Sequence, residues 1–577
     1  MQMMLKKVER PRELKWFQAG AMLYGDWGTS KAYVIGIAYA LAGHASWFFL
    51  GLMAILTLVV GYCYTIICRI YPDGGGVYSA LRSRSRLFAS IGAFMLVADY
   101  VVTASLSGLA AFHYFNVSHP AIWAMGAIIV IGGLNWIGPA RGSDLAAVVG
   151  VAASLCACVL FVFTIPHVGE VTLTMPDAGL WNGWTTFAGI VLALSGVEAV
   201  ANMTGIMVEP VGKTSKKAIW PVLIEVVLLT FLLGVAMNGV PGDLTHHIED
   251  MLRVLGKHYV APWFGEVIAI VFAILLLSAV NTAVNAFTSI QFSMAKDGEL
   301  PNFFARLNRF GMPWPALLAA IAVPVSVLVF VNDLVSLAAL YAIGVVGAIT
   351  LNLGACASNF ALPLKRWERA LLFVVSLILL AIWITIAIEK TKALIFALIV
   401  IGVGLAMRTA VKTFLPAPAA PVAVPSAEVL TVAEAKDIGP LYHSSFMLAL
   451  KRVTPAMVEN AALQVKARKE NSIYFCHVEE IPPSVELPAE VTPSAKSLEL
   501  LAEVEHHFSE RGITLIPVWQ VGHQAGRQLA YAANQLGVKT VLIGTTEHTA
   551  LMNLVRGDVM RTLAQHLNKD CNLMILS

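Results

Sequence analysis

The sequence predicts an all-α membrane bundle of twelve transmembrane helices, followed by a cytosolic α/β domain. Apolar residues make up 58% of the 577 residues and charged residues only 13%, whereas about one quarter of a soluble domain is charged. Twelve apolar runs are each long enough to cross a bilayer of about 30 Å. After them, a Pro- and Ala-rich stretch leads into short apolar runs that alternate with helical patterns, as in a parallel sheet.

The overall composition argues against several kinds of partner. A net charge of +3 is too small to indicate a nucleic-acid partner. The seven cysteines are scattered, and the closest two, Cys156 and Cys158, point to different faces of a helix. We therefore expect reduced cysteines and no resident cofactor. The basic N-terminal segment precedes an apolar run without a cleavage pattern, so we expect a retained first helix.

The twelve runs also predict the orientation of the chain. They cover residues 16–43, 45–70, 87–115, 120–137, 143–166, 184–208, 217–240, 261–292, 314–331, 333–358, 367–388 and 390–410. Basic residues concentrate in the even-numbered connections, for example Lys213, Lys216 and Lys217, while the odd-numbered ones hold few. The positive-inside rule then places both termini in the cytoplasm of a multi-pass protein, which we assign to a bacterial plasma (inner) membrane.

Two of the runs are interrupted by polar residues at corresponding places. The first is broken at Gly25–Ser30, and the sixth is broken at Ser195–Glu198. Paired interruptions five spans apart are the best sequence pointer to the site of an inverted-repeat transporter. A charge at the bilayer centre also costs roughly 2.5 to 3.5 kcal/mol, so it persists where it faces a protein interior or an aqueous path. A five-plus-five inverted repeat with two appended helices is the expected plan.

Three further motifs carry a resemblance to a known superfamily. A Pro-x-Gly-Gly-Gly-x-Tyr loop ends at Tyr78, Gly196-x-Glu198 lies in the sixth span, and Ala-x-Asp-Gly-x-Leu-Pro covers 295–301. Together they resemble the amino acid–polyamine–organocation (APC) superfamily over residues 16 to 410. The resemblance implies a LeuT-like fold with a central site between spans 1, 3, 6, 8 and 10.

The first span narrows the resemblance. An amino acid permease usually has only small residues there, because helix-end N–H groups must receive a substrate carboxylate. This chain has Asp26, and its Gly-Asp-x-Gly-Thr-Ser-x-x-Tyr pattern is similar to the KUP/KimA group of potassium importers. Stretches 99–103, 194–199 and 340–342 agree with the KimA-like branch. The resemblance implies a cation path lined by Asp26, Tyr33, Asp99, Tyr100, Thr103, Ser195, Glu198 and Tyr341.

The chemistry of these residues suits a hard monovalent cation. Hydroxyl, carbonyl and carboxylate oxygens can replace the water around potassium, and we expect Asp26, Asp99 and Thr103 to contact it. Asp99 and Thr103 are four residues apart and share a helix face. A carboxylate in a low-dielectric cavity can hold a proton at neutral pH. The candidates for proton coupling are Asp26, Asp99, Glu198 and Lys31.

Lys31 departs from the pattern, because KUP-type sequences have a proline in that part of the motif. It leaves two alternatives open. In the first, Lys31 pairs with an acid as a structural or proton-coupling element, and Glu225 in the seventh span and Glu266 near the start of the eighth are possible partners of buried charge. In the second, its ammonium takes the place of the cation beside Asp26. The second alternative would favour an organic substrate. Counting 100° per residue, Lys31 lies roughly opposite Tyr33 on the helix.

The remainder of the chain is divided into a Pro/Ala-rich linker at 412–440 and a soluble domain at 441–577, after a transporter domain at 1–411. The soluble domain resembles the universal stress protein family. Gly544, Gly557 and Asp558 are its candidate nucleotide-binding residues, but a glycine is missing between them and Lys451 replaces an acidic residue. The alternatives are a regulatory adenine nucleotide, a cyclic dinucleotide, or no ligand and a purely structural role in forming a homodimer.

The sequence therefore predicts a secondary transporter, not an enzyme, that imports potassium ions with protons by alternating access. Its expected partners are potassium, protons and membrane lipid. The first alternative is a proton-coupled amino acid or polyamine permease of the same fold. The second is a membrane sensor that signals through the cytosolic domain, although no output motif is present.

Overall fold

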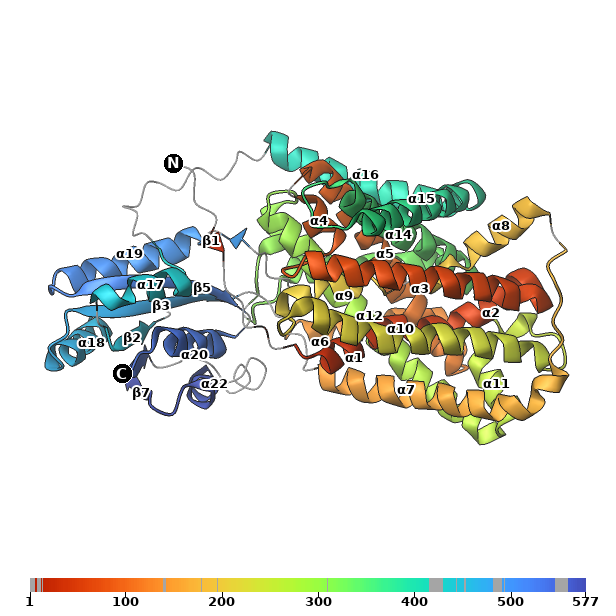
Figure 1. Cartoon of the computed structure of the whole chain (residues 1–577), viewed down its shortest axis with the longest axis horizontal. Helices are drawn as coiled ribbons and strands as arrows, with labels where there is room; N and C mark the ends of the chain where they lie inside the picture. The colour runs from red at the N-terminus through yellow and green to blue at the C-terminus, as the bar shows by residue number, and fades with distance from the viewer. Residues whose placement is uncertain are drawn as a thin grey trace.

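The computed structural model has two units, a helical bundle and a C-terminal α/β domain (Figure 1). It describes residues 6–7, 12, 14–82, 84–137, 142–177, 179–194, 196–308, 310–414, 429–442, 444–450, 453–480, 490–491, 493–522, 524–544 and 559–576. The helical bundle precedes the α/β domain along the chain, as the composition predicts.

All twelve expected spans are helical. Ten are essentially continuous: α3 (Ser46–Ile70), α5 (Arg86–Tyr114), α6 (Pro120–Asn135), α7 (Gly142–Thr164), α10 (Val211–Ala236), α12 (Pro262–Lys296), α13 (Trp314–Phe330), α14 (Leu334–Ser358), α15 (Arg366–Glu389) and α16 (Thr391–Phe414). The first span is α1 (Trp16–Trp27) plus α2 (Ser30–Ala42), and the sixth is α8 (Leu180–Gly189), η3 (Val191–Leu194) and α9 (Ala199–Asn202).

Eight helical segments of the described chain are long and apolar enough to cross a membrane. One of them, Trp16–Ile70, contains the first two expected spans. The helices α6 and α13 are apolar but shorter, with 16 and 17 residues, and the sixth span is divided into short pieces. The eight long segments hold nine of the expected spans, and α6, α13 and the divided sixth span are the other three. The chain is a multi-pass membrane protein.

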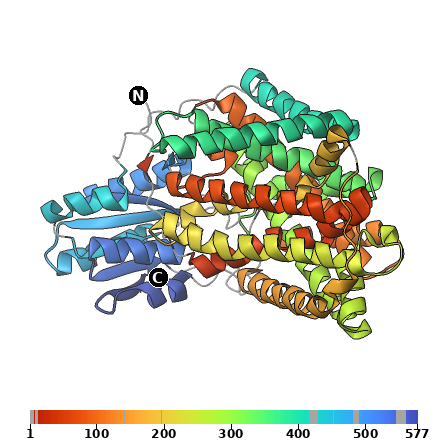
Figure 2. The same cartoon turned by 45° about the vertical axis from the view of Figure 1, so that its right-hand side comes forward.

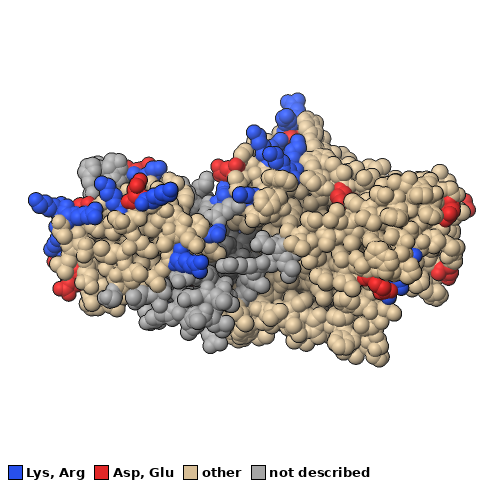
Figure 3. Space-filling view, turned by 90° about the horizontal axis from the view of Figure 1, so that it is seen from below, with Lys and Arg blue, Asp and Glu red and all other residues tan. Residues whose placement is uncertain are grey.

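The long helices of the bundle run side by side, and α3 and α10 keep this arrangement when the molecule is turned (Figures 1 and 2). Side chains on the outer faces are apolar, and a wide band of the surface carries few charges (Figure 3). Basic side chains gather at the end of the bundle that faces the C-terminal domain (Figure 3). This distribution matches a membrane-embedded band with a positively charged end.

Two short helices fall between the spans. The helix α4 (Val77–Arg82) follows the glycine-rich loop after α3, and α11 (Met251–Tyr259) precedes α12. The loop before α11 contacts the second half of the first span, because a Cβ on Gly36 of α2 would lie 2.0 Å from the backbone oxygen of Ile248. Neither helix was expected, since hydropathy reports spans and not surface helices.

The C-terminal domain is a parallel sheet covered by helices on both faces. Its strands are β2 (Phe446–Ala449), β3 (Ser472–Glu480), β5 (Thr514–Gly522), β6 (Thr540–Gly544) and β7 (Asn572–Leu576), in the order β5-β3-β2-β6-β7. One apolar core packs α18 (Pro455–Ala467) and α19 (Ala495–Ser509) on the sheet. The other packs α20 (Ala525–Leu536) and α22 (Val559–His566). All five expected strands are confirmed.

The segment before this sheet differs from the expected linker. Residues 432–442 form α17 (Val432–Tyr442), and Val432 and Ala435 are buried in the second apolar core of the domain. Leu430 also pairs with Val518 of β5. The assignment of 412–440 to a linker is therefore too long at both ends, since α16 continues to Phe414. A separate pair of two-residue strands joins β1 (Lys6–Lys7) to β4 (Glu490–Val491).

Candidate functional site

The interruption of the first span is a tight turn inside an otherwise helical run. The helix α1 ends at Trp27, α2 begins at Ser30, and Gly28 and Thr29 between them keep helical dihedral angles. Thr29 donates from its backbone N–H (3.3 Å) and from Oγ1 (2.5 Å) to the carbonyl oxygen of Asp26. The helix thus tightens to three-residue bonding directly after Asp26, which is less unwinding than the sequence predicts.

The interruption of the sixth span is a true break. Gly196 has a φ of +88°, a conformation that a residue with a side chain rarely adopts. A Cβ on Gly196 would lie 2.9 Å from the backbone nitrogen of Trp27 and 3.2 Å from Cγ of Asp26. The two interruptions therefore contact each other at Gly196. Glu198 lies two residues further along the chain from this contact.

The third span supplies a carboxylate and a hydroxyl from one helix face. Asp99 of α5 is buried, and Thr103 Oγ1 donates to the Asp99 carbonyl oxygen (2.9 Å) and to its Oδ1 (3.1 Å). The tenth span crosses α5 here, since a Cβ on Gly344 of α14 would lie 2.9 Å from the Asp99 backbone nitrogen. The close crossing brings Tyr341, one helical turn before Gly344, to the same region.

Two buried tyrosines complete this cluster. The Tyr341 side chain interacts electrostatically with Asp99, Tyr33, Asp26 and Glu198. Tyr33 of α2 likewise interacts with Asp26 and Asp99. Five of the predicted residues from the first, third, sixth and tenth spans are therefore within interaction range of one another, and Thr103 joins them through Asp99.

We call Asp26, Asp99 and Glu198 the acid cluster. All three interact electrostatically, and Asp99 and Glu198 are neighbours. Like charges this close repel each other unless a proton or a cation compensates one of them. No salt bridge to a basic side chain involves any member of the cluster among the described residues. Nor do three acidic, histidine or cysteine side chains of the described chain converge closely enough to hold a metal ion by themselves.

The structure places Lys31 away from the acid cluster. Lys31 is 0% exposed, and its Nζ donates to both carboxylate oxygens of Glu225 on α10, at 2.7 and 2.8 Å. It also donates to the Tyr24 hydroxyl (2.9 Å), which in turn donates to Glu225 (3.0 Å). Lys31 therefore has a complete set of partners on the opposite side of the helix from Tyr33. Of the two alternatives, the structure supports pairing with an acid.

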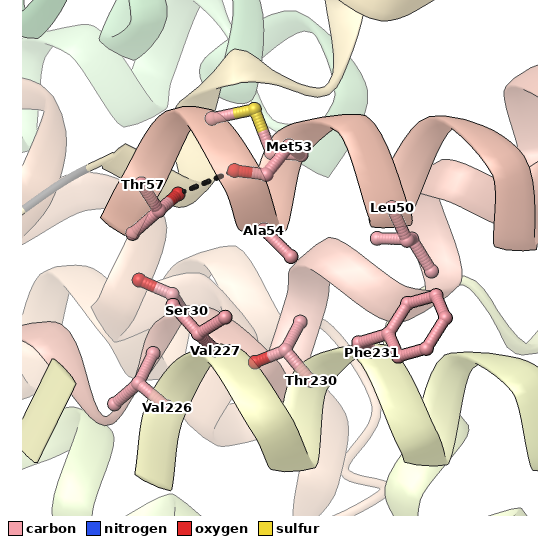
Figure 4. A pocket seen from close by; sticks show the side chains of 9 residues that line it. All are labelled: Ser30, Leu50, Met53, Ala54, Thr57, Val226, Val227, Thr230 and Phe231. Atoms are coloured by element: carbon pink, nitrogen blue, oxygen red, sulfur yellow. Dashed lines mark hydrogen bonds between the residues drawn. The ribbon is translucent and has the colours of Figure 1, made fainter. Parts of the chain in front are cut away.

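A small cavity lies between α2, α3 and α10 (Figure 4). Its volume is about 20 Å³, which suits roughly one water molecule. It is lined by Ser30, Leu50, Met53, Ala54, Thr57, Val226, Val227, Thr230 and Phe231, from α2, α3 and α10. The hydroxyls of Ser30 and Thr230 are buried without a hydrogen-bond partner among the described residues. One water molecule in this cavity could hydrogen-bond to a hydroxyl of its wall.

Other predicted residues lie apart from the cluster or outside the described chain. The Tyr100 hydroxyl accepts a hydrogen bond from Asn202 Nδ2 at 3.4 Å, at the end of α9. Gly544 is the last residue of β6 in the C-terminal domain. Ser195, Gly557, Asp558 and Lys451 lie outside the described residues.

Sequence reasoning missed two contributors to the site. Tyr64 of α3 is buried and interacts electrostatically with Glu198. Gly344 allows the close crossing at Asp99. A glycine inside an apolar run, one turn after Tyr341, was the available signal for the crossing. A lone tyrosine in an apolar run gave no signal for Tyr64.

Comparison with known proteins shows the family of the chain. A family described as "Amino acid permease" matches residues 14–422. The chain belongs to this permease family. The family is one of transporters within the APC superfamily, and the expectation of a transporter rather than an enzyme agrees with it.

Individual relatives of this permease point to two kinds of substrate. It is 25% identical over 392 residues to "Potassium transporter KimA" of Bacillus subtilis (strain 168), a match that covers 62% of this chain and 63% of that protein. It is 26% identical over 236 residues to "L-asparagine permease" of Salmonella typhimurium, covering 37% and 46% of the two chains. A shorter match, 29% identical over 164 residues, is to "L-asparagine permease" of Escherichia coli (strain K12), covering 27% and 31%. The chain covers less than two thirds of the length of each of these relatives.

Proposed function

We propose that this permease imports potassium ions together with protons, by alternating access across a bacterial inner membrane. The observation that carries the proposal is the acid cluster, in which the buried carboxyl groups of Asp99 and Glu198 and the half-buried one of Asp26 interact without a basic partner among the described residues. Uncompensated carboxylates in a low-dielectric interior are costly, so they favour a cation or protons as their counter-charge.

The groups around the acid cluster support a monovalent cation. Asp26, Asp99 and Thr103 offer oxygen atoms, and the hydroxyls of Tyr33 and Tyr341 are within interaction range. Potassium is bound by several such oxygens in place of its water shell. The close pair of Asp99 and Glu198 would hold the coupled proton, because the two groups share one more readily than they both ionise.

The surroundings of Lys31 also support this substrate. Its ammonium is bonded to Glu225 and Tyr24, so the positive charge is already balanced away from Asp26. We therefore assign Lys31 a structural role, and we retain Asp26, Asp99 and Glu198 as the proton-coupling groups.

A second candidate is a proton-coupled amino acid or polyamine permease. The similarity to two L-asparagine permeases favours it. A polyamine is itself a cation and would suit the acid cluster, whereas an amino acid carboxylate would be repelled by Asp26.

Growth of a potassium-uptake-deficient bacterium at micromolar potassium tests the proposal. We expect the wild-type chain to restore growth. We expect Asp26→Asn to reduce potassium uptake more than about tenfold, because removing the carboxylate that pairs with the bound cation costs about 2–5 kcal/mol of binding free energy. Glu266→Gln serves as the matched control, because Glu266 pairs with Arg253 and Lys257 at the protein surface. Failure of a well-expressed wild-type chain to rescue, with uptake of labelled asparagine or polyamine instead, would favour the second candidate.

A further inference from the structure

One stripe of α10 changes from basic to apolar along its length. Lys213, Lys217, Trp220, Ile224 and Leu228 follow one another at intervals of three or four residues, so they lie on one face of the helix. The two lysines are exposed, and Ile224 and Leu228 are exposed large apolar side chains. This face therefore runs from the end of the bundle into the apolar band of the surface.

The lysines stand at the unfavourable end of their helix. Lys213, Lys216 and Lys217 occupy the first two turns of α10, where the helix dipole favours negative charge, and the first turn contains no acidic residue. No carboxylate forms a salt bridge with any of the three among the described residues. Positive charge at a helix N-terminus without a neighbouring acid is unfavourable, and such violations are expected at functional sites. We interpret this one as a contact with an anion.

Aromatic side chains from three helices adjoin these lysines. The Tyr62 ring of α3 stacks on Trp367 of α15, with centroids 6.2 Å apart, and lies 6.5 Å from the ring of Trp220. Trp367 is half exposed. Tyrosine and tryptophan favour the level of the lipid headgroups, because one part of each ring system is apolar and another is polar. We call Lys213, Lys216, Lys217, Tyr62, Trp220 and Trp367 the interfacial patch.

An ion pair between a half-exposed arginine and a buried carboxylate fixes the geometry of the interfacial patch. Arg69 of α3 donates through Nη2 to both oxygens of Glu368 at the start of α15, at 2.9 and 2.8 Å. A Cβ on Gly212 would lie 3.2 Å from Cγ of Arg69, so the first turn of α10 contacts the same arginine. Arg69 is thus neutralised and joins the three helix ends, while the three lysines retain their charge.

We propose that the interfacial patch binds an anionic phospholipid, with its phosphate at the lysines and its acyl chains along α10. The occupant is a lipid and not a soluble anion, because the basic stripe continues along the same helix face into the exposed apolar side chains of Ile224 and Leu228. Basic sites between transmembrane helices at the membrane surface are suited to anionic headgroups. The proposal is independent of which substrate is transported.

Native mass spectrometry of the purified full chain tests the proposal. Phosphatidylglycerol and phosphatidylcholine with the same acyl chains are added in turn. We expect the wild-type chain to retain phosphatidylglycerol about tenfold more strongly, and the triple variant Lys213→Gln/Lys216→Gln/Lys217→Gln to lose that preference. The matched control is Lys390→Gln/Lys392→Gln, which removes two exposed lysines just before and in the first turn of α16 and should keep the preference.

Three results would overturn the proposal: equal retention of the two lipids, a triple variant that keeps the preference, or full displacement of phosphatidylglycerol by soluble glycerol phosphate. If the triple variant fails to fold, quenching of tryptophan fluorescence by brominated phosphatidylglycerol gives a second measurement. Trp220→Phe/Trp367→Phe should then lose most of the quenching that distinguishes this lipid from brominated phosphatidylcholine. Equal quenching differences in the two proteins would also contradict the proposal.

Discussion

The helical bundle buries two groups of charged side chains, and they differ in their partners. Lys31 is fully buried beside Glu225, which is 17% exposed, and Tyr24 closes a three-membered network with them. The acid cluster of Asp26, Asp99 and Glu198 has carboxyl neighbours and hydroxyl groups but no salt bridge within the described chain. Each group includes one residue from the same stretch of the first span: Asp26 for the acid cluster and Lys31 for the ion pair.

This difference separates a buried charge that the protein neutralises itself from the acidic groups of the proposed transport site. A complete ion pair balances its own charge and needs no further ligand, whatever its net contribution to stability. An acid cluster without a base is stable only when protons or a cation compensate it. Burial alone therefore does not distinguish the two groups, whereas the lack of an opposite charge is what supports the proposed role of the acid cluster. Breaking each group should have a different consequence, and the predictions below test that.

The largest expected effect on stability comes from Lys31→Met. It leaves the Glu225 carboxylate without its cation, and breaking a buried pair costs about 3–5 kcal/mol of unfolding free energy. The double variant Lys31→Met/Glu225→Leu should recover most of that loss, because it removes both charges. Denaturant unfolding in mixed micelles measures these differences.

The matched change in the acid cluster is Asp26→Asn. No salt bridge is broken there, so we expect unfolding free energy to stay the same or to rise while transport is lost. If the Lys31→Met chain is as stable as wild type, the Lys31–Glu225 pair does not stabilise the fold and does not differ from the acid cluster in that respect. If the Lys31→Met/Glu225→Leu variant still shows proton-coupled uptake, Lys31 takes no part in proton coupling. If a stable double variant has lost proton-coupled uptake, Lys31 belongs to the proton-coupling groups.

A second paired acid lies where the bundle meets the linker. Glu299, in the loop after α12, accepts from Arg408 of α16, from Lys412 (3.2 Å) and from Ser90 Oγ (3.1 Å). Burial acts to raise the pKa of Glu299, but the hydrogen bonds from Arg408 and Lys412 outweigh it, and the pKa lies below its ordinary value of about 4.5. The charged carboxylate therefore stabilises the folded state.

The pH dependence of Glu299→Gln follows from that direction. Because the folded pKa is depressed, the stabilisation is fully present above the unfolded-state pKa and is lost as the pH falls through the folded value. We expect Glu299→Gln to cost about 2 kcal/mol at pH 7, as for a hydrogen bond to a charged group, and the difference from wild type to shrink below pH 4.5. Thermal unfolding at pH 7, 5 and 4 measures it; a difference independent of pH would contradict this assignment.

The sequence predicted the spans well because their signal is local. Twenty apolar residues identify a helix wherever it lies, and Gly196 beside Glu198 identified the break in the sixth span. The sequence offered Glu225 and Glu266 as possible partners of buried charge but could not say which of them meets Lys31, since Glu225 lies 194 residues away and hydropathy does not fix the rotation of a helix about its axis. The start of the C-terminal domain was missed for a similar reason, because α17 is stabilised by packing on the sheet and follows a Pro-rich stretch.

The smallest expected effect on stability is that of Glu266→Gln, which shows what an exposed ion pair of this bundle contributes. Glu266 is 52% exposed and accepts from Arg253 and Lys257, both at 2.8 Å. Exposed pairs of this kind contribute about 0–1 kcal/mol, and salt screens them. We expect a change in unfolding free energy below about 1 kcal/mol at low salt and none at about 1 M salt. Glu225 and Glu266 have the same side chain and similar distances to a lysine, so their different burial is the variable under test. A loss at Glu266 as large as that at Lys31 would mean that distance, and not burial, decides what an ion pair contributes in this bundle.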